Sequence, residues 1–139
     1  MKKLFLLKCV GTARTAIDLI PKKNGLYVEV SIEDKSYKML VDTGANTIIL
    51  ADGAFKELSN KYKVDRLETI LMANGTSVVA PIVHNIVYNI GDKQILGYAA
   101  IVPMNRKACF DGIIGLPLLK LLKASIDIDN NKLYISGDD

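Results

Sequence analysis

The sequence predicts an all-β protein, a small barrel or sandwich with a short helix near its C-terminal end. Its 139 residues are enough for one domain with its own core and too few for two ordinary ones. Half of the residues are apolar and 24% are charged, which is the balance of a globular protein. Turn signals alternate with short β-branched and aromatic runs at a spacing of roughly 8 to 12 residues, which is typical of all-β folds.

Five dipeptides mark the predicted turns. They are Asn24-Gly25, Glu33-Asp34, Asn74-Gly75, Gly91-Asp92 and Asn130-Asn131. Gly, Asn and Asp adopt at low cost the positive φ angles that two-residue hairpin turns require. We therefore expect strands on both sides of each turn.

The expected strands are the runs of Val, Ile, Leu and Tyr between these turns. They lie at residues 27–32, 39–41, 78–83, 86–90, 95–102, 125–128 and 133–135. Because the chain has no Trp and only three Phe, the core that these strands enclose must be mainly aliphatic.

Two segments break the strand pattern and predict short helices. A helix after Asp52 would place Phe55 and Leu58 on one side. Residues 116–125 give the stronger signal, because Pro117 suits a first helical turn and the leucines after it form a broad apolar face.

Charge and ligand-type residues argue against several classes of function. The net charge of +3 is modest and Lys and Arg are spread along the chain, so we expect no nucleic-acid partner. The single histidine, His84, has no ligand pattern around it and is interpreted as a loop residue. Cys9 and Cys109 form neither a redox motif nor a zinc site; we expect reduced thiols, with a disulfide as the alternative. No metal and no cofactor are expected.

Residues 1–16 are expected to form an N-terminal arm or an extra strand, ahead of a domain at residues 17–139. The start, MKKLFLLKCVG, begins like a signal peptide, but Lys8 ends the apolar stretch well before the usual length of roughly 7 to 15 residues. No stretch reaches the roughly 18 to 20 apolar residues of a membrane helix. We expect a cytoplasmic protein with no membrane span, with export by a weak N-terminal signal as the alternative.

An acid and a glycine interrupt the apolar segment KMLVDTGANTIIL, residues 38–50. A buried carboxylate costs free energy unless it is paired or hydrogen-bonded, so Asp42 marks either a tight turn or a site of chemistry. The triplet Asp-Thr-Gly alone is weak evidence, because Asp favours the first position of a β-turn and Gly the last. Its context adds specificity, since apolar runs flank it and a second signature, GIIGLPLLKLL, begins at Gly112.

With these segments in this order, the chain resembles the retroviral-type (retropepsin-like) aspartic proteases, in particular their small bacterial members. The resemblance runs from about Ile20 to the C-terminus. The matching segments are GLYVEVSIEDKSYKMLVDTGAN, the hairpin MANGTS in the place of a flap, GIIGLPLL in the place of the family's apolar-apolar-Gly stretch, and SIDIDNNKLYI as the closing hairpin. The resemblance implies a small, closed, barrel-like acid-protease fold with one short C-terminal helix.

Three features depart from the family pattern. The segment MKKLFLLKCVGTARTA has no counterpart, Asn46 stands where many relatives have Ser, Thr or Asp, and Leu116 stands where retroviral enzymes often have a polar residue. None of these changes removes the reacting carboxylate.

The resemblance implies that Asp42 is catalytic and that it works as one half of a pair. The family's mechanism uses two carboxylates that share one proton, and this sequence has one Asp-Thr-Gly. The second carboxylate would then be Asp42 of another subunit in a homodimer, since a two-fold axis brings a residue against its own copy.

Neighbouring residues would support this carboxylate. Thr43 would brace the subunit interface, Gly44 would let its N–H approach the carboxylate, and Ala45 would keep the floor of the cleft small. Below the loop, Ile113 and Ile114 would pack and Gly115 would allow strands to approach closely. For the two isoleucines, ordinary core packing is the alternative.

The segment LMANGTSVVAPIV is the candidate flap, with Ala73, Asn74, Gly75 and Thr76 at its tip. Such a hairpin opens for a peptide and closes to exclude water. A peptide or protein substrate would bind extended, with strand-like backbone hydrogen bonds. An ordinary surface hairpin is the alternative.

The function predicted from the sequence is therefore an aspartic endopeptidase. A catalytically inactive module that kept the fold for binding or dimerisation is the second reading, because fold does not fix function. A generic β-sandwich with an accidental triplet is the third.

Overall fold

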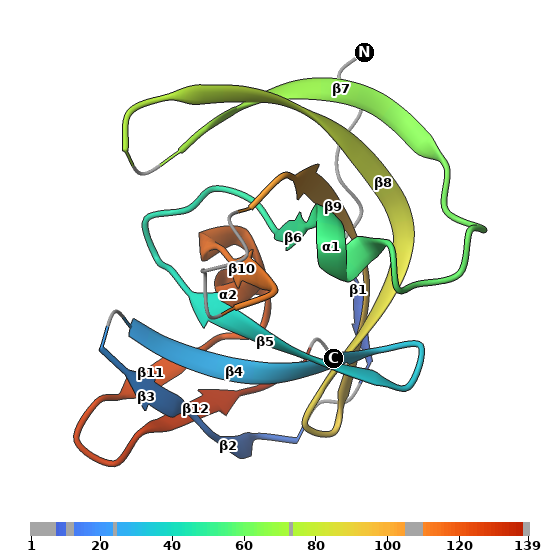
Figure 1. The fold of residues 1–139 in the computed structure, drawn as a ribbon. Coiled ribbons are helices and arrows are strands. Elements are labelled where there is room, and N and C mark those ends of the chain that lie inside the picture. Colours follow the sequence, from blue (N-terminus) through green and yellow to red (C-terminus); the bar gives the residue numbers. More distant parts are fainter. Residues whose placement is uncertain (1–7, 11–12, 24, 73, 105–109, 138–139) are drawn as a thin grey trace.

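The computed structural model describes residues 8–10, 13–23, 25–72, 74–104 and 110–137, which are mostly strand. The strands are β1 (Lys8–Val10), β2 (Thr15–Asp18), β3 (Ile20–Lys22), β4 (Gly25–Ile32), β5 (Lys35–Val41), β6 (Ile49–Ala51), β7 (Val64–Leu71), β8 (Ser77–Ile90), β9 (Lys93–Val102), β10 (Gly112–Ile114), β11 (Ser125–Asp127) and β12 (Lys132–Ile135). The helices are α1 (Asp52–Phe55) and α2 (Leu116–Leu121). The prediction of an all-β fold with a short C-terminal helix is confirmed (Figure 1).

Strand pairing follows a path that returns to its start. Beginning at β9, neighbours pair in the order β6, β10, β5, β4 and β8, and β8 pairs with β9 again. The β10–β5 and β6–β9 pairs are parallel, and the other pairs in this ring are antiparallel. This ring gives the fold the barrel-like character that was expected.

The remaining strands lie outside the ring. β1 pairs with β9 and β3 with β4, while β2, β12 and β11 form a separate three-stranded sheet. β2 runs across position 16, where the expected arm would give way to the expected domain. Most of that arm, and Cys109, lie outside the described residues.

The turns largely follow their sequence signals. Positive φ angles occur at Glu33, Asp34, Gly75, Gly91 and Asn131, which confirms four of the five predicted turns. Asn24 lies outside the described residues.

The β7–β8 hairpin differs from the expectation in two ways. β7 was not predicted, because the apolar residues of VDRLETIL do not alternate with polar ones. Residues 78–83 and 86–90, predicted as two strands, belong to one strand, β8. Its pairing with β9 shifts register between Val83 and Ile86, where Asn85 has a φ of 64°. A bulge of this kind bends a strand without ending it.

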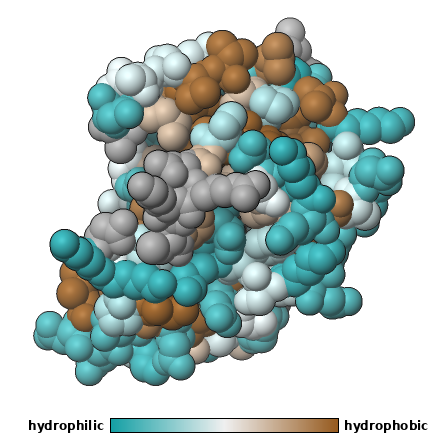
Figure 2. Space-filling view, viewed as in Figure 1, coloured by the Kyte–Doolittle hydropathy of each residue, from teal (hydrophilic) through white to brown (hydrophobic). Residues whose placement is uncertain are grey.

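The hairpin carries exposed apolar side chains on one face. Leu67, Leu71 and Val79 are 66%, 74% and 65% exposed, and Val79 pairs with Thr69 between the two leucines. Figure 2 shows hydrophobic side chains gathered along the edge of the molecule where Figure 1 places this hairpin. The other face points toward the body of the protein.

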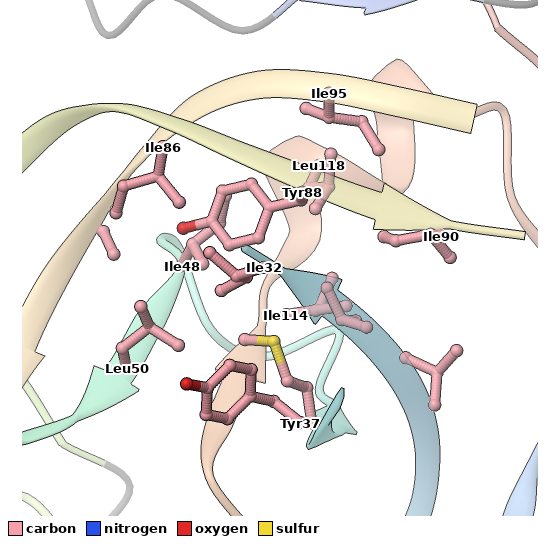
Figure 3. Close-up of a cluster of buried hydrophobic side chains, with 14 of the residues drawn as sticks. Ile32, Tyr37, Ile48, Leu50, Ile86, Tyr88, Ile90, Ile95, Ile114 and Leu118 are labelled. Atoms are coloured by element: carbon pink, nitrogen blue, oxygen red, sulfur yellow. The ribbon is translucent and has the colours of Figure 1, made fainter. Parts of the chain in front are cut away.

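Two clusters of buried side chains form the core. The larger cluster fills the ring, and Figure 3 shows Ile32, Tyr37, Leu50, Tyr88 and Leu118 converging there from five different elements. The smaller cluster lies beneath the β7–β8 hairpin. It contains Ile49, Ala80, Ile82, Tyr98, Ala100, Val102 and Ile113. No helix among the described residues is long and apolar enough to cross a membrane.

Candidate active site

The Asp42 loop begins where β5 ends, and a parallel strand far along the chain fixes its position. Ile113 and Ile114 of β10 lie beside Leu40 and Val41 of β5. The backbone N–H of Asp42 then donates to the carbonyl of Ile114 at 3.0 Å. Because β10 is also paired on its other side with β6, the loop leaves a strand held within the sheet.

The loop turns back on the Asp42 carboxylate. The Gly44 N–H donates to Asp42 Oδ1 at 2.9 Å, and the Ala45 N–H donates to the Asp42 carbonyl at 3.1 Å. A Cβ atom at Gly44 would lie 3.2 Å from Oδ1, which is a tight contact, so glycine lets this N–H approach freely. Asp42 itself is half-buried.

Glycine is also required beneath the loop. A Cβ atom on Gly115 would lie 2.4 Å from the Thr47 carbonyl oxygen and 2.6 Å from that of Ala45. The next residue, Leu116, donates its N–H to the Ala45 carbonyl at 2.8 Å. Residues 115–116 therefore lie directly against the backbone of the Asp42 loop.

The two isoleucines between Gly112 and Gly115 have separate environments. Ile114 packs in the larger core cluster, whereas Ile113 belongs to the smaller cluster and lines the cavity at Asp42.

Thr43 points away from this packed floor. It is exposed and lines a shallow cavity with Leu116, Leu119 and Ile126. Its hydroxyl makes no hydrogen bond within the part of the chain that the structure describes.

The tip of the β7–β8 hairpin is a hydrogen-bonded turn. The Met72 N–H donates to the Thr76 carbonyl at 2.8 Å, and the Gly75 N–H donates to the Met72 carbonyl at 3.0 Å. Asn74 Oδ1 accepts from the Thr76 N–H at 3.0 Å and from its hydroxyl at 2.6 Å. Gly75 and Thr76 are exposed, and Ala73 lies outside the described residues.

A cavity of about 600 Å³ joins the hairpin tip to the Asp42 loop. Met72 and Asn74 line it from the hairpin, and Asp42, Gly44 and Ala45 line it from the loop. Most of its remaining lining is apolar: Leu40, Ile49, Leu71, Met104, Phe110 and Ile113. Asp42 is the one acidic side chain that lines it among the described residues.

A second cavity of about 310 Å³ adjoins the first. It shares Gly44, Ala45, Ile49 and Leu71 with the first cavity. Its other lining residues include the polar Asn46, Thr47, Glu68 and Thr69. The cleft beneath the hairpin thus has an apolar compartment and a mixed one, named the polar compartment, in which these polar side chains lie beside Ile70 and Ile82.

The negative charge of Glu68 affects the pKa of the buried Tyr98. Burial raises the pKa of the Tyr98 hydroxyl; a hydrogen bond with Thr47 opposes the shift, and the charge of Glu68 adds to it.

Other aspartates are held in structural roles. Asp111 Oδ2 accepts from the Lys38 N–H at 2.9 Å, and the Asp127 carboxylate accepts from the backbone and side chain of Asn130. These bonds lower the pKa of Asp127. Within the described residues, no cluster of His, Cys, Asp or Glu has the arrangement of a metal site.

Several residues of the cleft were not predicted from the sequence. Met104, Phe110 and Glu68 lie in no predicted motif, and Leu40 and Met72, although they lie in the Asp-Thr-Gly and flap segments, were not predicted to line the site. Period-two alternation from the hairpin tip would have placed Met72, Ile70 and Glu68 on one face, had β7 been recognised as a strand. Met104 and Phe110 reach the site through tertiary packing alone.

Comparison with known proteins shows that the chain belongs to an aspartyl protease family. Residues 28–121 match the model of the family described as "gag-polyprotein putative aspartyl protease". Over 113 residues, 81% of the chain, it is 30% identical to the UBA domain-containing protein Mud1 of Schizosaccharomyces pombe and 31% identical to DNA damage-inducible protein 1 of Chaetomium globosum. The chain spans 33% and 25% of the lengths of these two relatives.

A solved structure shows the same fold. The retropepsin-like aspartic protease from Rickettsia conorii superimposes with a TM-score of 0.60, covering 99% of this chain and 97% of its own, at 19% identity.

Proposed function

Because the chain belongs to the retropepsin-like aspartic protease family, we propose that it is an aspartic endopeptidase whose active site forms between two copies. The observation that carries the proposal is the Asp42 loop: a carboxylate fixed by a backbone N–H, facing a largely apolar cavity beneath a hairpin. No second acid lines that cavity among the described residues. The missing carboxylate is therefore assigned to Asp42 of a partner subunit.

The proposed chemistry needs two carboxylates and one water. Two acids at close range do not both ionise, so the pair holds one proton. The ionised carboxylate takes a proton from water as the oxygen attacks the peptide carbon, and the protonated carboxylate donates to the carbonyl oxygen. Collapse of this tetrahedral intermediate breaks the C–N bond, with a proton passing to the leaving nitrogen.

The surrounding residues have matching roles in the proposal. Asn74, Gly75 and Thr76 cover an extended peptide from above. Thr43, exposed and without a hydrogen bond in the described chain, contacts the partner's loop. Ala45 keeps space for the peptide, and Ile113 and Gly115 support the loop from below.

Replacing the acid tests the chemistry. Asp42→Asn should lower kcat/KM for peptide cleavage by at least about a hundredfold, the lower range for loss of an acid–base group, while the thermal unfolding midpoint changes little. Asp129→Asn removes an exposed carboxylate away from the cleft and serves as the control. A variant that cleaves as fast as the wild type would contradict the assignment.

Mixing tests the shared site. After subunit exchange in an equal mixture of wild type and Asp42→Asn, about a quarter of randomly formed dimers carry two aspartates. At a fixed total protein concentration, the cleavage rate of the mixture should fall toward about a quarter of the wild-type rate. A site contained within one subunit would leave about half. A stable monomer that cleaves no peptide between mildly acidic and neutral pH would favour a non-catalytic binding module instead.

A further inference from the structure

The polar compartment of the cleft contains one charged side chain, Glu68, among its described lining residues. Glu68 lies on the inward face of β7, opposite the buried Ala80 of β8. Ile70, two residues further along the same face, packs on the smaller core cluster. The backbone therefore fixes the direction in which the Glu68 side chain leaves the strand.

Glu68 keeps free capacity for a ligand. Its Oε1 accepts from Arg66 Nε at 2.7 Å, and Oε2 makes no hydrogen bond within the described residues. Its side chain is 39% exposed, so a group entering the compartment can reach it.

Glu68 is not the only carboxylate that contacts Arg66. Arg66 also contacts Asp65, at 3.0 Å between Nη1 and Oδ2, so two carboxylates share one guanidinium. Asp65 in turn contacts His84 Nε2 at 3.2 Å. The smaller compartment itself is lined by no lysine or arginine among the described residues.

We propose that Glu68 makes this protease prefer peptides with a lysine or arginine beside the apolar residue that fills the larger compartment. The inference rests on the proposed function and names its substrate class. An ammonium or guanidinium forms a charge-assisted hydrogen bond to Oε2, which is stronger than a bond from a neutral donor. The two compartments share residues 44, 45, 49 and 71, so the basic residue lies within about two or three positions of the scissile bond in an extended peptide.

The proposed dimer makes the preference symmetric. Each subunit would supply its own Glu68 on its own side of the two-fold axis. Basic residues should therefore be enriched at equivalent positions before and after the cleaved bond.

Matched fluorogenic peptides test the proposal. A set carrying Lys, norleucine, Gln or Glu at each position around an apolar cleavage site is cleaved by the wild type, Glu68→Gln and Glu68→Lys. We expect the wild type to show a Lys-to-norleucine ratio of kcat/KM of about ten, the scale of one charge-assisted contact. The ratio should fall to about one in Glu68→Gln, and Glu68→Lys should favour Glu over Lys. Glu29→Gln, an exposed acid on β4, should keep the wild-type ratio.

The controls separate the substrate preference from the proposed chemistry. Peptide binding to Asp42→Asn and to Asp42→Asn combined with Glu68→Gln provides a readout that needs no cleavage, and circular dichroism verifies folding. If the wild type cleaves these peptides without a basic preference, or if Glu68→Gln keeps the preference, the role of Glu68 is overturned and the protease assignment stands. If no peptide is cleaved and none binds in a Glu68-dependent manner, both proposals fail.

Discussion

The floor and the cover of the cleft are built in opposite ways. The floor, residues 42–47 with β10 and Gly115, lies against buried strands and is held by backbone hydrogen bonds on several sides. The cover, the β7–β8 hairpin, has a leucine-bearing face in solvent and a tip closed by its own turn. In the proposed protease, this difference would combine a carboxylate held in place by the floor with a hairpin free to move over it.

The largest expected effect is on the floor. In Gly115→Ala the new methyl group meets two backbone carbonyl oxygens that cannot move without disturbing the loop, so we expect a loss of about 3 kcal/mol in the free energy of unfolding. Urea denaturation monitored by circular dichroism measures it.

Gly53→Ala is the matched control, because a Cβ atom there has nothing within 4 Å. It should be neutral or stabilising by up to about 1 kcal/mol. Equal stability losses in both variants would mean that the floor is not held by close backbone contact.

A smaller effect is expected at the tip of the cover. Asn74→Ala removes two hydrogen bonds to Thr76, and the loss should be about 1 kcal/mol or less and confined to the hairpin. Hydrogen exchange should become faster at residues 74–77 and stay unchanged at residues 112–114. Asn74→Asp keeps an acceptor at this position and should behave like the wild type. Faster exchange in the floor would show that the two regions are coupled.

The smallest expected effect is on the pH dependence of stability. It concerns the hydrogen bonds that join Glu33, in the turn between β4 and β5, to the segment before β7. The Ser59 N–H, the Tyr62 hydroxyl and the Ser59 hydroxyl donate to Glu33 and lower its pKa from 4.5 to about 2. Since the folded-state pKa is depressed, this stabilisation is present above about pH 4.5 and is lost as the pH falls toward 2.

Glu33→Gln should therefore flatten the decline in stability over this acidic range, as followed by denaturation midpoints at a series of pH values. Asp34→Asn, at the exposed neighbouring position, should keep the wild-type slope. An unchanged slope in Glu33→Gln would show that these hydrogen bonds do not persist in solution.

The floor was more accessible to sequence reasoning than the cover. Asp42, Gly44 and Gly115 stand in local signatures, and their backbone requirements follow from residue type. β7 was missed because apolar side chains lie on both of its faces, Leu67 and Leu71 outward and Ile70 inward, so apolar and polar residues do not alternate. The inward position of Glu68 and Ile70 is explained only by the cleft beneath the strand, which the sequence does not reveal.

Two residues that line the larger cavity were also beyond prediction from the sequence. Met104 and Phe110 enter the cleft from segments flanking residues 105–109, which lie outside the described part of the chain. Nothing in their immediate sequence marks them, since their position depends on contacts between distant strands.

The bond between the Lys38 N–H and the Asp111 carboxylate joins residues 73 positions apart, next to the parallel pairing of β5 with β10. Such distant contacts close late, because a long loop must lose its freedom first. A nascent chain on the ribosome thus carries Asp42 while residues 43–111 are made, before β10, the strand that positions it, is present. Under the proposed function, proteolytic activity would begin only once translation has passed Gly115, and this order would protect the unfinished polypeptide and its neighbours from premature cleavage.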